Sequence, residues 1–277
     1  MREDILIREA RIRDAPYIKQ LWQRVFNDTD DVIAAFFEVY VDVRLCVLAQ
    51  LENRLAAFGL LLPVGEFVAP EAPPRPCAMM YAVGADPELR GLGCASLVTR
   101  ELLTVGKKHG FEVIALRPAT PTLFDFYGKN GFYEAFYCRE RRVSANEIEK
   151  AASIITQPVP ERVSPEAYKK RRESLLGGVA HVAFDKRALA FQERINPGGG
   201  LFFVGDSCAA VEITHSGGIR IAELIGAGEG ALAALAAMFP AKQYLVREPD
   251  FSVAPPQSAR FGMANIDAAA YMGFTFG

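Results

Sequence analysis

The segment PELRGLGCASLVTRELL, from Pro87 to Leu103, places two glycines two residues apart at the start of a predicted helix. Gly91 and Gly93 follow Arg90 closely, and apolar residues then recur at the spacing of one helix face. The first turn of a helix carries backbone N–H groups without an acceptor, and glycine lets an anion approach them. Because several N–H groups converge there and Arg90 adds a positive charge, the segment predicts a pyrophosphate site.

Two common phosphate-binding loops do not fit this segment. A Walker loop ends in Gly-Lys-Ser or Gly-Lys-Thr, whereas this chain continues Gly93-Cys94-Ala95. A dinucleotide-binding loop needs a third glycine, where this chain has Ser96, and an acidic residue that ends the next strand. Glu112 precedes that strand instead. The remaining pattern, Arg-x-x-Gly-x-Ala, is satisfied by residues 90–95 at every specified position.

This pattern resembles the pyrophosphate loop of the GNAT acyltransferases, which bind acetyl-CoA. VGADPELRGLGCASLVTRELL (83–103) and LFDFYGKNGF (123–132) are similar to two segments of that family, in the family's order and with the strand FEVIALRP between them. The resemblance covers residues 81–132. It implies an α/β fold with a mixed sheet, with acetyl-CoA as the cosubstrate and no metal.

The resemblance also implies which residues contact acetyl-CoA. The strand before the loop is expected to bulge, at Gly84, and its backbone pairs with the pantetheine. Tyr127 matches the family tyrosine that protonates the departing thiolate; the alternative is an aromatic side chain that only packs on an amphipathic helix. The residues expected at the cofactor are Ala82, Val83 and Ala85 on the strand and Arg90, Gly91, Leu92, Gly93, Cys94, Ala95 and Ser96 in the loop.

The general base is not evident, because the strand CAMMYAV (77–83) contains no carboxylate. In similar two-domain enzymes that acetylate aminoglycosides, the C-terminal carboxylate of the chain reaches the active site. The apolar ending YMGFTFG predicts a buried tail, so the carboxylate of Gly277 is a candidate base. A water chain, or an acceptor that is already neutral, is the alternative. We expect Asp28, Asp30 and Glu38 to cap helices or face solvent.

The pattern of predicted helices and strands changes after residue 143. Residues 1–143 read β-α-α-β-β-β-α-β-α-β, with Asp14 as the expected cap of the first helix, and are predicted to form a GNAT domain. After the proline-containing segment 156–165, the order strand-strand-strand-helix-strand recurs. The whole chain resembles a two-domain GNAT subgroup, which implies a degenerate GNAT-like domain over 144–277. Its glycine-rich segment ELIGAGEGALAAL lacks an arginine, so we expect no second CoA site there.

Composition sets broad limits on function and location. The net charge of −2 over 277 residues argues against binding to nucleic acid or to an anionic membrane surface. The charged N-terminus is not typical of a secretion signal, and the apolar runs are too short to span a bilayer. Five cysteines without a C-x-x-C pair favour a reducing cytoplasm. Cys94, at a helix N-terminus, is predicted to have a lowered thiol pKa or to be a small spacer.

The sequence therefore predicts an acetyl-CoA-dependent N-acetyltransferase that moves an acetyl group directly to a primary amine. The alternative is a non-catalytic acyl-CoA-binding module. The missing strand carboxylate favours this alternative, whereas Tyr127 and its context favour the enzyme. The acceptor, a small molecule or a peptide, is not predicted, because the residues that shape its pocket carry no pattern. A homo-oligomer is compatible with the sequence.

Overall fold

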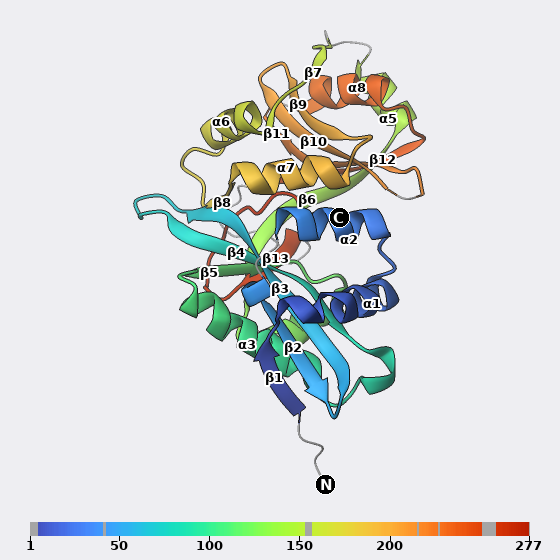
Figure 1. Cartoon of the computed structure of the whole chain (residues 1–277). Coiled ribbons are helices and arrows are strands. Elements are labelled where there is room, and N and C mark those ends of the chain that lie inside the picture. Colours follow the sequence, from blue (N-terminus) through green and yellow to red (C-terminus); the bar gives the residue numbers. More distant parts are fainter. Residues whose placement is uncertain are drawn as a thin grey trace. The chain divides into compact units, whose positions relative to one another are not determined.

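The computed structural model describes residues 5–40, 43–152, 157–214, 216–226, 228–250 and 259–276. The chain forms two compact units (Figure 1). Unit 1 comprises Met1–Phe67, Pro74–Ala135 and Gly262–Ala268, and unit 2 comprises Val68–Pro73, Phe136–Phe261 and Ala269–Gly277. The units meet along the chain inside one long strand, β6 (Tyr133–Ser144). The division predicted after residue 143 falls near the end of this strand.

Unit 1 is built on a mixed sheet, as predicted. Its strand order is β1 (Ile5–Glu9), β2 (Cys46–Leu51), β3 (Arg54–Val68), β4 (Arg75–Ala85), β5 (Val113–Leu116) and β13 (Arg260–Ala264). Neighbouring strands run antiparallel except β4 and β5, which are parallel. The helix α3 (Cys94–Lys108) connects this parallel pair. A turn at Glu52 and Asn53 joins β2 to β3 as a hairpin, with Glu52 at a φ of +53°.

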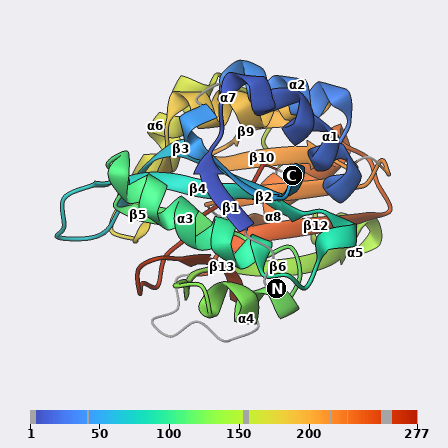
Figure 2. The same ribbon diagram turned by 60° about the horizontal axis from the view of Figure 1, so that its bottom comes forward.

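Helices cover both faces of the unit 1 sheet (Figure 2). On one face, α1 (Ala15–Phe26) and α2 (Asp30–Val39) bury Trp22 against Phe58 of β3, with ring centroids 5.8 Å apart. On the other face, α3 packs Val98 and Leu102 over Gly59, where a Cβ atom would lie 2.7 Å from Leu102. Short 3-10 turns, η1 (Ile12–Asp14), η2 (Val43–Leu45) and η3 (Pro87–Leu89), and helix α4 (Thr122–Gly128) complete the unit.

The predicted cap of α1 is wrong. Asp14 makes no side-chain capping bond to this helix and has helical backbone angles itself. Its carboxylate instead accepts two hydrogen bonds from Arg8, at 2.7 and 2.8 Å, and one from the backbone N–H of Arg11 at 2.7 Å. The guanidinium of Arg8 lowers the pKa of Asp14, although burial acts in the opposite direction. A cationic partner on β1 therefore outcompetes the helix N-terminus for this side chain.

Unit 2 repeats the central order of unit 1. Its sheet runs β6, β12 (Gln243–Pro249), β11 (Ile219–Ile225), β10 (Ser207–Ile213), β9 (Gly200–Val204) and β7 (Pro160–Arg162). In this sheet β11 and β12 pair in parallel, with α8 (Gly228–Met238) between them, and the other neighbouring strands pair antiparallel. The order β9-β10-β11-α8-β12 thus corresponds to β2-β3-β4-α3-β5. The remaining elements are α5 (Ala145–Ala152), α6 (Pro165–Leu175), β8 (His181–Phe184) and α7 (Lys186–Ile195).

Candidate functional site

Strand β4 carries a β-bulge beyond the end of its pairing with its parallel neighbour β5. Parallel pairing joins Cys77–Met79 to Val113–Ala115, and within the described residues it ends at Met79. Farther along β4, Phe58 faces Gly84 and Leu60 faces Tyr81, so two residues of β4 stand opposite one residue of β3. A bulge of this kind bends its strand. Within the described residues, β4 is therefore unpaired with β5 after Met79, and it bends at Ala82 and Val83 on the way to the glycine loop.

The bulge lies at Ala82 and Val83 rather than at Gly84. Ala82 has a φ of +50°, in the left-handed region that side chains other than glycine rarely adopt. Gly84 has no such backbone angle. A Cβ atom at Gly84 would lie 3.0 Å from Phe26 and 3.2 Å from Phe58, so glycine is needed there for the close packing of α1. The residues expected at the pantetheine, Ala82, Val83 and Ala85, are all partly exposed.

The glycine loop presents an open helix N-terminus. Gly91 and Gly93 have φ values of +85° and +84°, and no heavy atom lies within 4 Å of a Cβ built on either residue. Gly93 is the N-cap of α3 and supplies no side-chain cap. The first-turn N–H groups, which helix geometry leaves without intrahelical acceptors, therefore stand free for an anion. Arg90 and Leu92 are exposed beside them, and Ala95 and Ser96 are partly buried in the first turn.

The turn before this loop is anchored by Asp86, a residue that the sequence analysis missed. Asp86 is 2% exposed, and its carboxylate accepts hydrogen bonds from the N–H of Glu88 at 3.0 Å and from Arg54 at 3.2 Å. Arg24 of α1 forms an ion pair with the same carboxylate. Burial alone would raise the pKa of Asp86, but the N–H of Glu88 and the nearby guanidinium groups hold it below its usual value. The arginines that identify this anchor come from α1 and β3, so no local pattern indicates it.

Of the two expectations for Cys94, a lowered thiol pKa and a small spacer, the structure supports the spacer. The side chain is 2% exposed and belongs to the hydrophobic cluster beneath α3. Burial raises the pKa of the Cys94 thiol and outweighs the favourable position at the helix N-terminus. Cys94 is therefore a small packing residue, and its contribution to an anion site is limited to its backbone N–H.

Tyr127 lies on α4 in the core of unit 1. Its ring packs edge-on against Phe126 and Phe132, with centroid distances of 5.0 and 5.9 Å. The side chain is 9% exposed, and burial raises the pKa of the phenol to about 12. Its hydroxyl group makes no hydrogen bond to any residue that the structure describes. A phenol with this pKa is protonated throughout the neutral pH range, and its O–H group is available to donate a proton.

The acidic residues of the helical region are placed as follows. Asp28 accepts a hydrogen bond from the indole N–H of Trp22 at 2.8 Å, and Asp30 accepts one from Gln23. Glu38 is exposed near the end of α2. Gly277, the candidate base, lies outside the described residues. The tail before it is buried in unit 2, where Phe274 stacks on Phe184 at 4.6 Å, as the apolar ending predicted.

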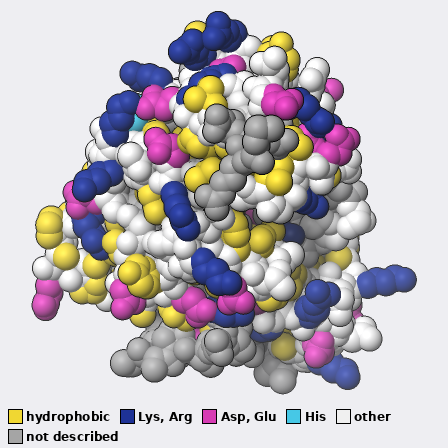
Figure 3. Space-filling view, turned by 90° about the horizontal axis from the view of Figure 1, so that it is seen from below, with side chains coloured by type: hydrophobic (Ala, Val, Ile, Leu, Met, Phe, Trp, Pro, Cys, Tyr) yellow, Lys and Arg dark blue, Asp and Glu magenta, His cyan; other side chains and the backbone are white. Residues whose placement is uncertain are grey.

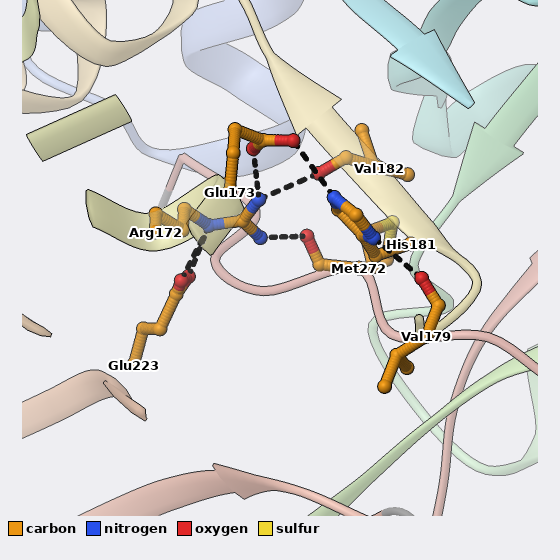
Figure 4. Close-up of polar contacts among 7 residues, drawn as sticks. All are labelled: Arg172, Glu173, Val179, His181, Val182, Glu223 and Met272. Atoms are coloured by element: carbon orange, nitrogen blue, oxygen red, sulfur yellow. Dashed lines mark hydrogen bonds and ion pairs between the residues drawn. The ribbon is translucent and has the colours of Figure 1, made fainter. Parts of the chain in front are cut away.

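The second unit has its own bulge, but its surroundings differ from those in unit 1. Ala210 faces Glu223 and Val211 faces Ile221, so Ala222 is the extra residue on β11. Glu223 follows the bulge and forms a fully buried ion pair with Arg172 of α6 (Figure 4). A Cβ atom at Gly273 would lie 2.8 Å from the Glu223 carboxylate. The C-terminal tail therefore covers the segment that corresponds to the exposed part of β4.

The described residues contain no cluster of three or more His, Cys, Asp or Glu side chains that could hold a metal ion. In the same part of the chain, every helix is too short or too polar to cross a lipid bilayer. On the face shown in Figure 3, basic and acidic side chains are interspersed rather than gathered by sign.

Comparisons with known proteins agree with this fold. Residues 6–135 match the family model of the acetyltransferase (GNAT) domain. A GCN5-related N-acetyltransferase from Anabaena variabilis aligns over 94% of this chain and 72% of its own, with 17% identity and a TM-score of 0.68. A GCN5-related N-acetyltransferase from Kribbella flavida aligns over 94% of this chain and 70% of its own, with 14% identity and a TM-score of 0.67. A protein from Pyrococcus horikoshii aligns over 98% of this chain and 95% of its own, with 16% identity and a TM-score of 0.61. No curated protein sequence matches the chain.

The family match and the mixed sheet place the protein among the acyltransferases with an α/β fold. Residues 6–135 form a domain of the GNAT acetyltransferase family, and unit 2 repeats the strand order of that fold around its parallel pair, β11 and β12. At identities below 25%, the structural neighbours support the fold of both units and not a substrate. The predicted family, fold class and enzyme class are confirmed.

Proposed function

We propose that the protein is an acetyl-CoA-dependent N-acetyltransferase that transfers the acetyl group directly to a primary amine. The observation that carries this proposal is the succession of the bulge at Ala82 and Val83 and the open first turn of α3 within one unit. A free strand backbone accepts a pantetheine by hydrogen bonding, and free helix amides accept a pyrophosphate. The two sites are joined by residues 84–93, so a single extended ligand reaches both.

Each part of acetyl-CoA has a proposed site. The phosphates bind the backbone N–H groups between Gly91 and Ser96, with the exposed guanidinium of Arg90 as an additional donor. The space around the two glycines supports this placement, because no protein atom lies within 4 Å of where their side chains would begin. The pantetheine lies along Ala82, Val83 and Ala85, and a backbone N–H of this segment polarises the thioester carbonyl.

The proposed reaction is a direct displacement at the thioester. The lone pair of the amine attacks the carbonyl carbon, the new C–N bond forms, and the C–S bond breaks with its electron pair on sulfur. Tyr127 donates its phenolic proton to that sulfur, and a base accepts the proton that the amine loses. The phenol then regains a proton from solvent. We propose the Gly277 carboxylate as this base, because the strand before the loop carries none.

The acceptor is proposed as a small-molecule or peptide amine, and the cytoplasm as the place of action. The alternative function is a non-catalytic acyl-CoA-binding module, which the missing strand carboxylate favours. A thiol-release assay distinguishes the enzyme from the binding module. It uses acetyl-CoA with a panel of diamines, aminoglycosides and peptides that have a free N-terminal amine. We expect amine-dependent release of CoA with at least one acceptor class. Binding of acetyl-CoA by calorimetry without release for any amine would favour the binding module.

A further inference from the structure

A buried asparagine joins the helix of the cofactor loop to the helix of the catalytic tyrosine. Asn130 follows α4 and is 4% exposed. Its side-chain nitrogen donates to the carbonyl oxygen of Phe126 at 2.7 Å, and its side-chain oxygen accepts from Arg100 Nε at 3.0 Å. A longer contact, 3.4 Å, links the same nitrogen to the hydroxyl of Ser96. These partners fix the orientation of the amide, because Arg100 only donates and a carbonyl only accepts.

The backbone of Asn130 holds Tyr127 directly. Its N–H donates to the carbonyl oxygen of Tyr127 at 2.9 Å, and the N–H of Phe132 donates to the same oxygen at 3.2 Å. Asn130 therefore contacts two consecutive carbonyls, those of Phe126 and Tyr127, at the end of α4. The Tyr127 hydroxyl itself has no hydrogen-bonding partner within the described part of the chain, so the position of the ring depends on this backbone and on the packing of Phe126 and Phe132.

The other end of the contact lies on α3. Ser96 belongs to the first turn of that helix, where the phosphates are proposed to bind, and Arg100 lies one turn farther along. Arg100 is exposed, but its Nε atom is held by the buried amide. The side chain of Asn130 thus connects the first two turns of α3 with the end of α4.

We propose that Asn130 is a positioning residue that couples acyl-CoA binding at the first turn of α3 to the placement of the Tyr127 hydroxyl. This inference rests on the proposed function, because it assigns Tyr127 as the proton donor. Proton donation requires an accurate distance between the phenol and the sulfur, and small displacements reduce such a step by large factors. Asn130 contacts neither acetyl-CoA nor amine in this proposal.

The variant Asn130→Asp tests the coupling with almost no change of volume. It keeps an acceptor for Arg100 and loses the donor to Phe126, so a carboxylate oxygen meets a carbonyl oxygen. Asn265→Asp is a matched control in the same unit: Asn265 accepts from the N–H of Ile114 at 2.7 Å and donates to the carbonyl of Glu112 at 3.1 Å. This control undergoes the same chemical change without contacting α3 or α4 through its side chain.

The deciding measurement is a double-mutant cycle with Tyr127→Phe. We expect Asn130→Asp to lower kcat about tenfold or more, while the KM for acetyl-CoA changes less than about threefold. In the Tyr127→Phe background, the same change should alter kcat by less than about twofold, because the donor that it positions is already missing. Asn265→Asp should leave kcat within about twofold. Equal losses in both backgrounds would overturn the coupling and indicate a purely structural role.

A spectroscopic measurement covers the case in which no amine supports turnover. In protein labelled with 13C on the tyrosine rings, the Tyr127 signal is identified by its absence in Tyr127→Phe. We expect CoA to shift this signal in the parent and to leave it nearly unchanged in Asn130→Asp. A shift of equal size in both proteins overturns the coupling alone. A parent that binds no CoA by calorimetry overturns the proposed function, and the coupling with it.

Discussion

Arg172 and Glu223, 51 positions apart in the sequence, form an ion pair from which solvent is excluded. Nε of the arginine donates to both carboxylate oxygens, at 2.9 and 2.8 Å, and neither side chain is exposed. The two Nη atoms donate to the backbone carbonyls of Val182 and Met272, at 2.8 and 3.3 Å (Figure 4). One guanidinium thus connects α6, β8, β11 and the C-terminal tail, and it holds that tail within unit 2.

Replacing Arg172 with methionine should strongly destabilise the protein. The change leaves the Glu223 carboxylate buried without its partner, which typically costs about 3–5 kcal/mol. The double variant Arg172→Met/Glu223→Leu should recover most of this loss, because it removes both charges. Urea unfolding measures both. Arg141→Met is the control: its pair with Glu248 is partly exposed and should be worth about 0–1 kcal/mol. A similar loss of unfolding free energy for both arginine variants would contradict the conclusion that the buried Arg172–Glu223 pair is the more important one for stability.

Acid should weaken the neighbouring contact of Glu173. Burial acts to raise the pKa of this carboxyl, but the hydrogen bond from His181, at 2.8 Å, and the charge of Arg172 lower it below the usual value. The carboxyl has a pKa of about 4.3 when the chain is unfolded. Its contribution to stability is therefore complete well above that pH and is lost as the pH falls from there through the folded value.

The variant Glu173→Gln isolates this contribution. We expect the difference in unfolding free energy between parent and variant to be largest near pH 7 and to shrink below about pH 4.5. Glu166→Gln, at an exposed position of the same helix, should show a difference that stays nearly constant. A Glu173→Gln difference that does not depend on pH would contradict the role of the carboxylate.

Gly93→Asp should abolish binding of acetyl-CoA without unfolding unit 1. The change places a negative charge where the phosphates are proposed to bind, and aspartate tolerates a positive φ better than most residues. Gly110→Asp is a matched control, since Gly110 has a φ of +85° and no atom within 4 Å of its Cβ position, at the opposite end of α3. Calorimetry should show binding for the control alone. Unchanged affinity in Gly93→Asp would exclude this phosphate site.

Tyr127→Phe should lower turnover by about 10²-fold or more and leave the affinity for acetyl-CoA nearly unchanged. The ring still packs between Phe126 and Phe132, so the fold should persist. Because the pKa of Tyr127 is about 12, the parent should keep its proton donor up to pH 10 and beyond. Tyr133→Phe, with a side chain that is 55% exposed, should behave like the parent. A loss of only a few-fold in Tyr127→Phe would reduce this residue to a packing role.

Amidation of the C-terminus tests the proposed base. The modification removes the Gly277 charge with almost no change in volume, so the packing of Phe274 and Phe276 should survive. We expect normal binding of acetyl-CoA, together with a loss of turnover below the pKa of the amine, where a base is needed most. Semisynthetic proteins with amide and free-acid ends give the comparison. Equal pH–rate profiles for the two forms would rule out the carboxylate as the base.

Local sequence patterns determined several features of this protein. The glycine loop and α3, the hairpin turn at Glu52 and the repeated strand-helix order were all predictable. Each depends on residues within a few positions of one another, because helix periodicity, capping and tight turns are set by local spacing. The α/β class and the family followed from two such segments in a fixed order.

Other features were decided only by tertiary structure. The bulge falls at Ala82 because the register between β3 and β4 places it there. The sequence predicted it at Gly84, because glycine tolerates most backbone angles. Cys94 has a raised thiol pKa because apolar residues bury it, and Asp14 binds Arg8 rather than a helix end. Hydrogen bonds and ion pairs between distant segments, such as those of Asn130, require knowing which elements meet. The sequence contains the partners, but only the folded chain brings them within bonding distance.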